Sequence, residues 1–257
     1  MNTQDPLQWR VLPLAISLAC ATLLFGSFFL PGTAPLWQVL DVHVAFALNS
    51  LVTDSHAQQL LWAFGNLRLF DYIAAVVMLL LVVHYVLRDT RHAPAERAAR
   101  AGLVCLSLLL LIGIVRDLIL AHLDLQRTSP SLVLEPFTRL DQVINPGAKS
   151  SSDESFPGDH GTVVAIYVYL MWACAGRRYG VAALAIAMLV CLPRLVAGAH
   201  WLTDNIVGGG GIALLAVPWI TFTSLGPWVV ARITPLLAAA GMRTRQAGRR
   251  YSRRPDS

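Results

Sequence analysis

Residues 194–225 read RLVAGAHWLTDNIVGGGGIALLAVPWITFTSL, a cluster of charged and imidazole side chains that leads directly into an apolar run. A second stretch, FPGDH at residues 156–160, also places such side chains where an apolar segment begins. A charge next to lipid is costly and is seldom kept without a partner or a function. The two clusters therefore predict a membrane protein with a polar site at one end of its helices.

The composition places the whole chain in the same class. Apolar residues make up 56% of the 257 residues and charged residues only 14%, which is typical of a membrane protein. A helix needs about 20 residues to cross the ~30 Å hydrocarbon core, and six apolar runs come close to that length. We predict an all-α membrane protein with one domain over residues 1–242. Its six transmembrane helices are expected at about 11–30, 69–88, 102–123, 158–175, 180–197 and 204–225.

The segments between and after these runs have their own patterns. Residues 36–61 show apolar positions at helical spacing but are too polar to span, which predicts an interfacial helix on the outer leaflet. The long polar segment 124–159 touches both clusters, so we expect it to be functional rather than disordered. Residues 226–242 are expected to form an interfacial helix, and residues 243–257 a disordered basic tail.

Arginine is distributed unevenly between the predicted loops. Because cytoplasmic loops carry the excess of Lys and Arg, this distribution places both termini in the cytoplasm and both polar clusters on the opposite side of the membrane. The basic tail suits anionic headgroups better than nucleic acid, since only one aromatic residue lies within it. The arginines of the predicted cytoplasmic side are Arg88, Arg91, Arg97, Arg100, Arg177, Arg178, Arg243, Arg245, Arg249, Arg250, Arg253 and Arg254.

The cluster at residues 194–204 has a spacing that suits catalysis. His200 and Asp204 are four residues apart, so on a helix they share one face, and the carboxylate can hold one imidazole nitrogen while the other acts as a nucleophile. Arg194 lies where a short turn could bring it over the same point. A buried histidine satisfied by an aspartate, with an arginine reaching the interface, would explain this cluster equally well.

His160 adds weight to the functional interpretation. It follows Pro157, a residue suited to the first turn of a helix, where free backbone N–H groups favour an anion. A histidine there can give or take a proton near neutral pH. Two such clusters on one side of the membrane predict a site for anionic phosphate.

Together the motifs resemble those of the type 2 phosphatidic acid phosphatase (PAP2) superfamily, a family with a six-helix core. Its Ser-Arg…His…Asp signature is met by Arg194, His200 and Asp204, with Pro193 in place of Ser. Its Pro-Ser-Gly-His signature appears as PGDH at residues 157–160. The resemblance implies a membrane enzyme of phosphoryl transfer.

The first signature of the family, a Lys followed by Arg-Pro, is only partly present. Arg127 and Pro130 represent it, and Leu120 stands where the Lys would fall. With these departures the chain is most similar to a phosphotransferase branch of the superfamily. The likeness covers about residues 36–225 and is densest over 153–208. It implies undecaprenyl diphosphate as phosphate donor and lipid A 1-phosphate as acceptor.

The resemblance also implies roles for individual residues. His200 would attack the terminal phosphorus and become a phosphohistidine, Asp204 would orient it, and His160 would protonate the leaving group. Arg127 and Arg194 would hold the phosphoryl oxygens, which suits their forked geometry. No cofactor and no metal are expected, since no ligand spacing is visible along the sequence.

Other charged residues are harder to assign. We hypothesise that Arg68 helps to hold an acceptor or donor phosphate, although an ion pair with Asp71 is the simpler explanation. Arg116 and Asp117 lie inside the third predicted span without a clear role. Glu154 and Asp159 are negative charges beside a predicted phosphate site, where they should weaken phosphate binding.

Three functions compete at this point. A lipid phosphotransferase is favoured, acting on the periplasmic face of a bacterial inner membrane. The alternative is a lipid phosphate phosphatase that uses the same residues to hydrolyse undecaprenyl diphosphate or a phosphatidyl phosphate. A non-enzymatic lipid-binding or transport protein is less well supported, since no paired, broken spans in matching halves are visible. The oligomeric state does not follow from the sequence.

Overall fold

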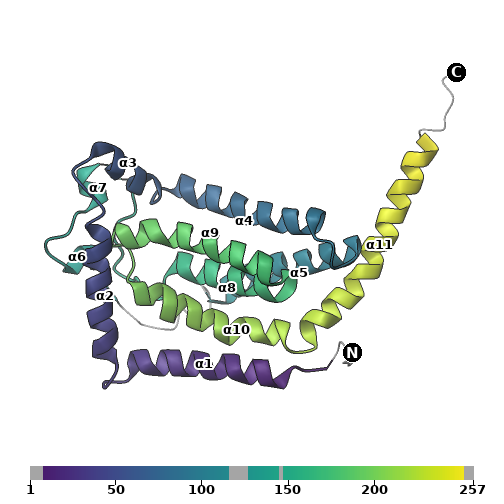
Figure 1. Cartoon of the computed structure of the whole chain (residues 1–257), viewed down its shortest axis with the longest axis horizontal. Coiled ribbons are helices and arrows are strands. Elements are labelled where there is room, and N and C mark those ends of the chain that lie inside the picture. The colour runs from purple at the N-terminus through teal and green to yellow at the C-terminus, as the bar shows by residue number, and fades with distance from the viewer. Residues whose placement is uncertain (1–7, 116–126, 145–146, 252–257) are drawn as a thin grey trace.

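The computed structural model describes residues 8–115, 127–144 and 147–251, and within these ranges the chain forms helices and no strand. Six helical segments lie roughly along one direction and form the bundle seen in Figure 1. They are α1 (Val11–Phe29), α4 (Arg68–Arg88), α5 (Pro94–Ile114), α8 (Asp159–Ala175), α9 (Arg177–Val196) and α10 (Gly211–Thr221).

Helix α8 is the centre of this bundle. It packs against α5, α9 and α10, and against the π-helix η2 (Asp204–Gly210) that continues into α10. Ile166 and Leu170 on α8 are fully buried, and the buried Tyr167 hydroxyl donates a hydrogen bond to the Met78 carbonyl of α4 at 2.8 Å. A buried hydroxyl needs such a partner, so this bond fixes α4 against α8.

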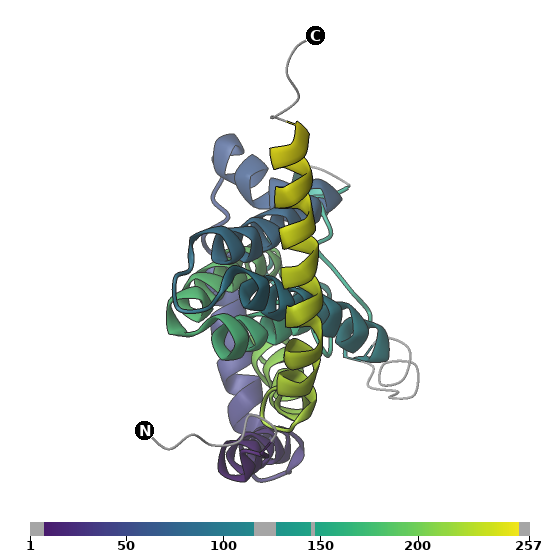
Figure 2. The same cartoon turned by 90° about the vertical axis from the view of Figure 1, so that its right-hand side faces the viewer.

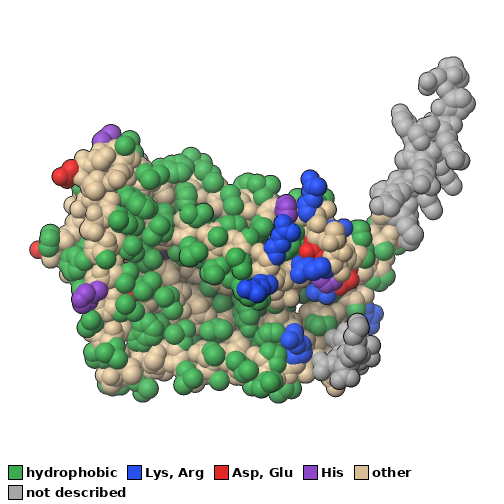
Figure 3. Space-filling view, viewed as in Figure 1, with side chains coloured by type: hydrophobic (Ala, Val, Ile, Leu, Met, Phe, Trp, Pro, Cys, Tyr) green, Lys and Arg blue, Asp and Glu red, His purple; other side chains and the backbone are tan. Residues whose placement is uncertain are grey.

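The six predicted spans are confirmed in part. Among the described residues, α1, α4, α5 and α9 are long and apolar enough to cross a membrane. A fifth span exists if η2 and α10 are taken with the first part of α11, to which they are joined at a bend of 54°. Helix α8 has 17 residues, or about 25 Å at 1.5 Å per residue, which is shorter than the ~30 Å hydrocarbon core. Apolar side chains cover the middle of the bundle surface, as a lipid-facing belt requires (Figure 3).

The single interfacial helix predicted over residues 36–61 is wrong in one respect. The chain forms two helices there, α2 (Ala34–Asn49) and α3 (His56–Phe64). In the segment between them the Thr53 carbonyl accepts a hydrogen bond from the Gln59 side chain at 3.0 Å. Helix α2 lies across the end of the bundle, at a steep angle to α1 (Figure 1).

The arginine-rich loops gather at the opposite end. Arg91 donates to the Ala175 carbonyl, and Arg100 to the Cys174 carbonyl at 3.4 Å, so the α4–α5 and α8–α9 connections meet. Figure 3 shows Lys and Arg concentrated at that end of the molecule. The two ends of the bundle therefore differ in charge as the sequence predicted.

The last helix extends further than expected. Helix α11 (Leu225–Tyr251) was predicted to end at residue 242, but it continues to Tyr251 and includes most of the segment predicted to be disordered. It packs against α5 and crosses the arginine-rich end of the bundle (Figure 2). The remainder of the basic tail, residues 252–257, lies outside the described residues, as does the end of the predicted third span.

Candidate active site

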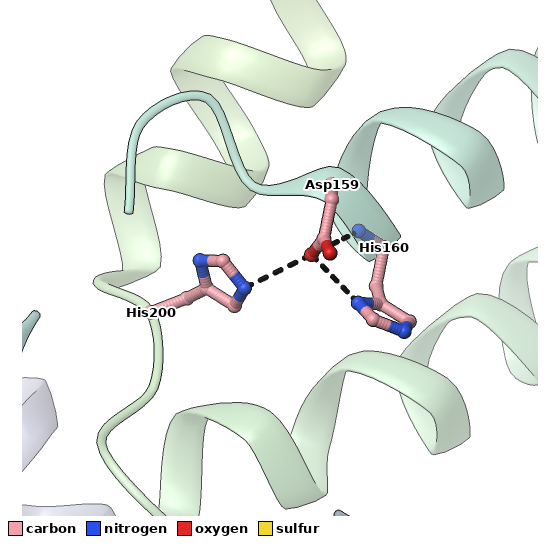
Figure 4. A group of neighbouring side chains, drawn as sticks. All are labelled: Asp159, His160 and His200. Atoms are coloured by element: carbon pink, nitrogen blue, oxygen red, sulfur yellow. Dashed lines mark hydrogen bonds and ion pairs between the residues drawn. The ribbon is translucent and has the colours of Figure 1, made fainter. Parts of the chain in front are cut away.

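The two sequence clusters meet at the end of the bundle opposite the arginine-rich loops. Asp159 and His160 open helix α8, and His200 lies in the turn between α9 and η2. Figure 4 shows the two imidazole rings on either side of the Asp159 carboxylate. Residues separated by 40 positions in the sequence thus form one site.

The turn that carries His200 is not helical, which corrects the helical spacing assumed from the sequence. Helix α9 ends at Val196, and Gly198 then adopts φ +71°, a conformation that side chains with a Cβ rarely adopt. A Cβ at this position would also lie 2.4 Å from the ring of Phe137. The turn therefore depends on glycine, and it places His200 and Asp204 side by side without a shared helix.

His200 is held by bonds at both ring nitrogens, and its side chain is only 3% exposed. Nδ1 lies 3.0 Å from the Ser155 carbonyl oxygen, which can only accept, so Nδ1 carries the proton. Nε2 lies 3.1 Å from Asp159 Oδ1 and is the nitrogen available for chemistry. Burial lowers the pKa of His200, but the carboxylates of Asp159 and Asp204 outweigh it and raise that pKa to about 9.

Asp204 lies close to His200 without the predicted hydrogen bond. Its Oδ2 is 3.7 Å from His200 Nδ1, too far for a hydrogen bond, and instead accepts the Trp201 N–H at 2.7 Å. Its Oδ1 accepts from Arg127 at 2.6 Å. The Ser155 carbonyl takes the orienting bond that the sequence assigned to Asp204. Asp204 contributes charge beside the ring and fixes the turn.

Arg127 is part of a buried network behind His200. It donates to Asp204 and also to Asp41 of α2, at 2.6 Å in both cases. Asp41 is 1% exposed and accepts further bonds from the Thr203 N–H and hydroxyl. The guanidinium also lies over the Trp201 ring, 5.1 Å from its centroid. Arg127 thus joins α2 to the start of η2, and its side chain remains 23% exposed.

Arg194 and His160 form the other side of the site, together with Asp71. Arg194 Nη2 donates to Asp71 Oδ1 at 2.7 Å and lies 3.2 Å from His160 Nε2. His160 places Nε2 3.0 Å from the same Asp71 oxygen and Nδ1 2.7 Å from Asp159 Oδ1. Both ring nitrogens of His160 therefore face a carboxylate, and no described residue offers a hydrogen-bond partner to the buried Nε of Arg194. The imidazole and guanidinium donors on this side of the site are thus held by Asp71 and Asp159.

Asp159 Oδ1 lies at the point on which both histidines converge. A phosphoryl oxygen bound between a nucleophilic and an acidic histidine would occupy the same place, and carboxylate and phosphate oxygens accept the same hydrogen bonds. Asp159 is about half exposed, and its Oδ2 lies 3.5 Å from Lys149 Nζ, which offers the carboxylate another partner. The Asp159 carboxylate oxygen thus marks a position between the two rings where an oxygen acceptor meets both histidines.

The same three side chains bear on the predicted absence of a metal. The possible ligand atoms of Asp159, His160 and His200 all lie within 4.8 Å of one another. The sequence showed no such set because its members come from two distant segments. The prediction of no metal relied on the lack of ligand spacing along the sequence, and the folded structure does not support that reasoning. Metal dependence is therefore tested by experiment below.

Close backbone packing holds the two segments together. The Gly158 N–H donates to the Asp204 carbonyl at 3.0 Å. A Cβ on Gly161 would lie 2.2 Å from Asn205 Oδ1 and 2.9 Å from Asn205 Cα, so only glycine fits there. The first turn of α8 can approach η2 closely for this reason, which brings Asp159 to His200.

Arg68 does not form the ion pair with Asp71 that the sequence suggested. Asp71 is bonded to Arg194 and His160, and Arg68 is exposed and forms no ion pair with any described residue. The simpler explanation of Arg68 is therefore wrong, and a role toward a substrate phosphate stays a prediction. Arg116 and Asp117 lie outside the described residues. Glu154 is exposed and makes no contact with the histidines.

Sequence reasoning missed two carboxylates that organise the site. Asp71 had been given to Arg68 because the two are neighbours in the chain. Asp41 lies in the segment predicted to form a surface helix, yet the buried face of α2 consists of Asp41, Ala45 and Asn49 at four-residue spacing. The polar residues Asp41 and Asn49 on one face were the available signal, because polar groups near lipid turn toward protein partners.

Comparison with known proteins gives an independent view of the chain. The PAP2 superfamily profile matches residues 124–225, which include both histidines, Arg127 and Arg194 but not Arg68. The chain is 32% identical over 202 residues to the lipid A 1-diphosphate synthase of Escherichia coli (strain K12), covering 79% of this chain and 84% of that protein. No solved structure matches.

Proposed function

Because the chain belongs to the PAP2 superfamily and is a membrane enzyme of phosphoryl transfer, we propose that it transfers the terminal phosphate of undecaprenyl diphosphate to lipid A 1-phosphate. The products are lipid A 1-diphosphate and undecaprenyl phosphate. The observation that carries the proposal is the convergence of His200 Nε2 and His160 Nδ1 on one carboxylate oxygen. The name of the E. coli relative supports the choice of acceptor.

In the first step the donor phosphate displaces the Asp159 carboxylate from between the rings. His200 Nε2 attacks the terminal phosphorus, a P–N bond forms, and the bond from that phosphorus to the bridging oxygen breaks. The bridging oxygen leaves on undecaprenyl phosphate and takes a proton from His160. Nδ1 of His200 keeps its bond to the Ser155 carbonyl throughout, which holds the ring for attack.

In the second step a phosphate oxygen of lipid A attacks the phosphohistidine. A new P–O bond forms, the P–N bond breaks and His200 is restored, while His160 takes a proton back from water. The acceptor oxygen already carries negative charge near pH 7, so charge repulsion is the main obstacle rather than removal of a proton. We propose that Arg194, which lies 3.2 Å from His160, and Arg127, which is bonded to Asp204 beside His200, stabilise the accumulating charge. Arg68, exposed at the start of α4, is proposed to assist with the acceptor phosphate.

The site is proposed to face the periplasm of a bacterial inner membrane. The arginine-rich loops lie at one end of the bundle and the site at the other, and the positive-inside rule assigns the arginine-rich end to the cytoplasm. A reporter fused after Arg97 should then be cytoplasmic, and one inserted between residues 129 and 149 should be periplasmic. The reverse result would reject this orientation.

The chemistry is tested with purified protein in vesicles and a donor labelled in its terminal phosphate. We expect an acid-labile phosphoprotein without acceptor, and labelled lipid A diphosphate with it. His200→Gln should abolish both products, whereas His43→Gln, which changes an exposed histidine on α2, should not. Release of inorganic phosphate at a rate that lipid A does not alter would instead favour the phosphatase. Activity that survives a chelator such as EDTA is expected, and loss of activity would point to a metal at the histidines.

A further inference from the structure

The chain carries its positive charge almost entirely as arginine. Lysine and arginine together number 20, and Lys149 is the single lysine among them. Arginine offers a rigid planar fork, whereas lysine offers a compact ammonium group on a flexible stem, with donors that rotate freely. Lys149 lies away from the arginine-rich loops and beside the candidate active site, where its Nζ is 3.5 Å from Asp159 Oδ2. The one flexible ammonium group on a side chain of this protein is therefore found next to the two histidines.

The backbone of Lys149 is held by the same group that contacts Arg194. The Lys149 N–H donates to the Asn66 carbonyl at 3.0 Å, and Arg194 Nη1 donates to the same oxygen at 3.4 Å. Both sequence neighbours of Lys149, Ala148 and Ser150, are buried. The Lys149 side chain itself is about half exposed. A fixed backbone thus carries a side chain that is free to change its contacts.

The two arginines of the site are already paired with carboxylates. Arg127 donates to Asp41 and Asp204, and Arg194 donates to Asp71. Three carboxylates therefore face two arginines before a donor phosphate adds negative charge of its own. Transfer of a phosphoryl group is stabilised by cations placed around its oxygens. The net charge of these five side chains does not supply that stabilisation.

Lys149 is a cation whose partner leaves when the donor binds. Among the described residues it forms an ion pair with Asp159 and with no other carboxylate. In the proposed first step the donor phosphate displaces the Asp159 carboxylate, and His200 has to be neutral in order to attack. Lys149 then loses its partner at the moment when negative charge enters the site. Phosphate oxygens accept the same charge-assisted hydrogen bonds as carboxylate oxygens, so the phosphate can replace Asp159 as the partner of Nζ.

We propose that Lys149 binds the terminal phosphate of the donor and keeps contact with it while it passes to His200 and then to the acceptor. The inference rests on the proposed function. An ammonium group on a flexible stem can follow the phosphorus as it moves, whereas the fork of an arginine fits one arrangement of oxygens. Lys149 acts only through charge and hydrogen bonds to the phosphoryl oxygens, and it neither gives up a proton nor forms a bond to phosphorus.

The first test replaces the lysine and measures the rate of phosphohistidine formation at low undecaprenyl diphosphate. Lys149→Met keeps an unbranched stem and removes the charge, so the rate should fall at least about tenfold. Lys149→Arg restores the charge and should recover part of that loss. Lys149 does not line the apolar groove that opens at Asp71, Asp159 and His160 between α4, α5 and α8, so neither variant changes the groove wall. A rate in Lys149→Met within about twofold of the wild type would overturn the inference.

Arg139→Met is the matched control, because it removes one positive charge from the same connection between α7 (Leu140–Val143) and its flanking loops. Arg139 pairs with Asp141 and contacts none of the groups of the site. Its rate should stay within about twofold of the wild type. An equal loss in Arg139→Met and Lys149→Met would assign the effect to the net charge of this region and would overturn the inference.

A double-mutant cycle separates contact with the phosphate from an effect that passes through Asp159. In protein that already carries Asp159→Asn, Lys149→Met should lower the rate by the same factor as in the wild type, within about twofold. The reason is that the proposed contact with the phosphate does not involve the carboxylate. A loss that disappears in the Asp159→Asn protein would show that Lys149 only holds Asp159, and the inference would be wrong.

The wild-type protein allows a direct test because it has a single lysine. Reductive methylation with isotope-labelled formaldehyde marks Lys149 and the α-amino group, keeps their positive charge and gives a separate NMR signal for each. Methylenediphosphonate, a diphosphate analogue that cannot transfer its phosphoryl group, should move the Lys149 signal and leave the α-amino signal in place. The same movement should occur in Asp159→Asn, since it reports the phosphate rather than the loss of the carboxylate.

The failure of this inference differs from the failure of the proposed function. A Lys149 signal that stays in place at methylenediphosphonate concentrations that block phosphohistidine formation would overturn the inference alone. Wild-type protein that forms no phosphohistidine with undecaprenyl diphosphate would refute the proposed function.

Discussion

Replacing Asp159 by Asn should shift the pH dependence of the first chemical step. In the free enzyme His200 has a pKa raised to about 9, so at pH 7 about one ring in a hundred carries the free Nε2 lone pair that attack requires. Asp159 Oδ1 lies 3.1 Å from that nitrogen. The variant keeps the size of the side chain and removes its charge.

The size of the shift follows from the distance. Two unit charges 3.1 Å apart interact by about 1.3 kcal/mol in water. This value is a lower limit, because the Asp159 side chain is about half exposed but the His200 side chain is only 3% exposed. That energy corresponds to about one pKa unit. The pKa of His200 should therefore fall by at least about one unit, and the neutral fraction at pH 7 should rise by at least about tenfold.

The assay is the rate of phosphohistidine formation measured from pH 6 to pH 10 at low donor concentration, where kcat/KM reports groups of the free enzyme. The rising limb near pH 9 should move to lower pH in the variant. Glu154→Gln removes a charge from an exposed residue of the same loop and should leave the limb in place. An unshifted limb in Asp159→Asn would refute the assignment of His200 as the group that titrates. An equal shift in both variants would show that the net charge of the loop matters rather than the contact.

Three further predictions concern stability in detergent. Gly161→Ala should lower the free energy of unfolding by about 1–3 kcal/mol, because the added Cβ would meet Asn205. Gly113→Ala has open space around its Cβ and should leave that free energy unchanged. Thermal melting measures both variants. Asp41→Ala removes a fully buried carboxylate from its arginine and should destabilise the protein by about 3 kcal/mol in denaturant titrations, and a change below about 0.5 kcal/mol would contradict the buried network. The pKa of His200 is raised in the folded protein, so the contribution of its charge to stability is complete below about pH 6.5 and is lost as the pH rises to about 9. The free energy of unfolding of the wild type should therefore fall by up to about 3 kcal/mol over that range. The fall should be smaller in His200→Gln.

Much of the site could be read from the sequence because its residues lie in short motifs. His160 and His200 were identified by their positions beside apolar runs, and the structure brings both rings to one carboxylate. Arg194 was expected to fold back over the site, and it lies 3.2 Å from His160. Local spacing was sufficient in these cases because each residue is within one turn of a helix end.

The partners of these residues could not be read in the same way. The sequence paired Asp204 with His200 and Asp71 with Arg68, in each case the nearest group of suitable chemistry along the chain. In the folded protein a backbone carbonyl of Ser155 orients His200. Hydrogen bonds between residues so far apart in the sequence depend on how the helices pack. Packing brings together segments that share no sequence pattern.

The sequence by itself was enough to predict a helical membrane protein with basic loops at one end and a cluster of histidines and charged residues at the other. Composition and the order of apolar runs are enough for that, because the cost of charge in lipid acts on each segment separately. Only the tertiary structure decided that Asp159 stands between the two histidines, that Asp41 reaches the site from α2, and that a groove extends from His160 between α4, α5 and α8. Those features arise from the distances between helices, and these are set by side-chain packing and by glycines that allow close approach.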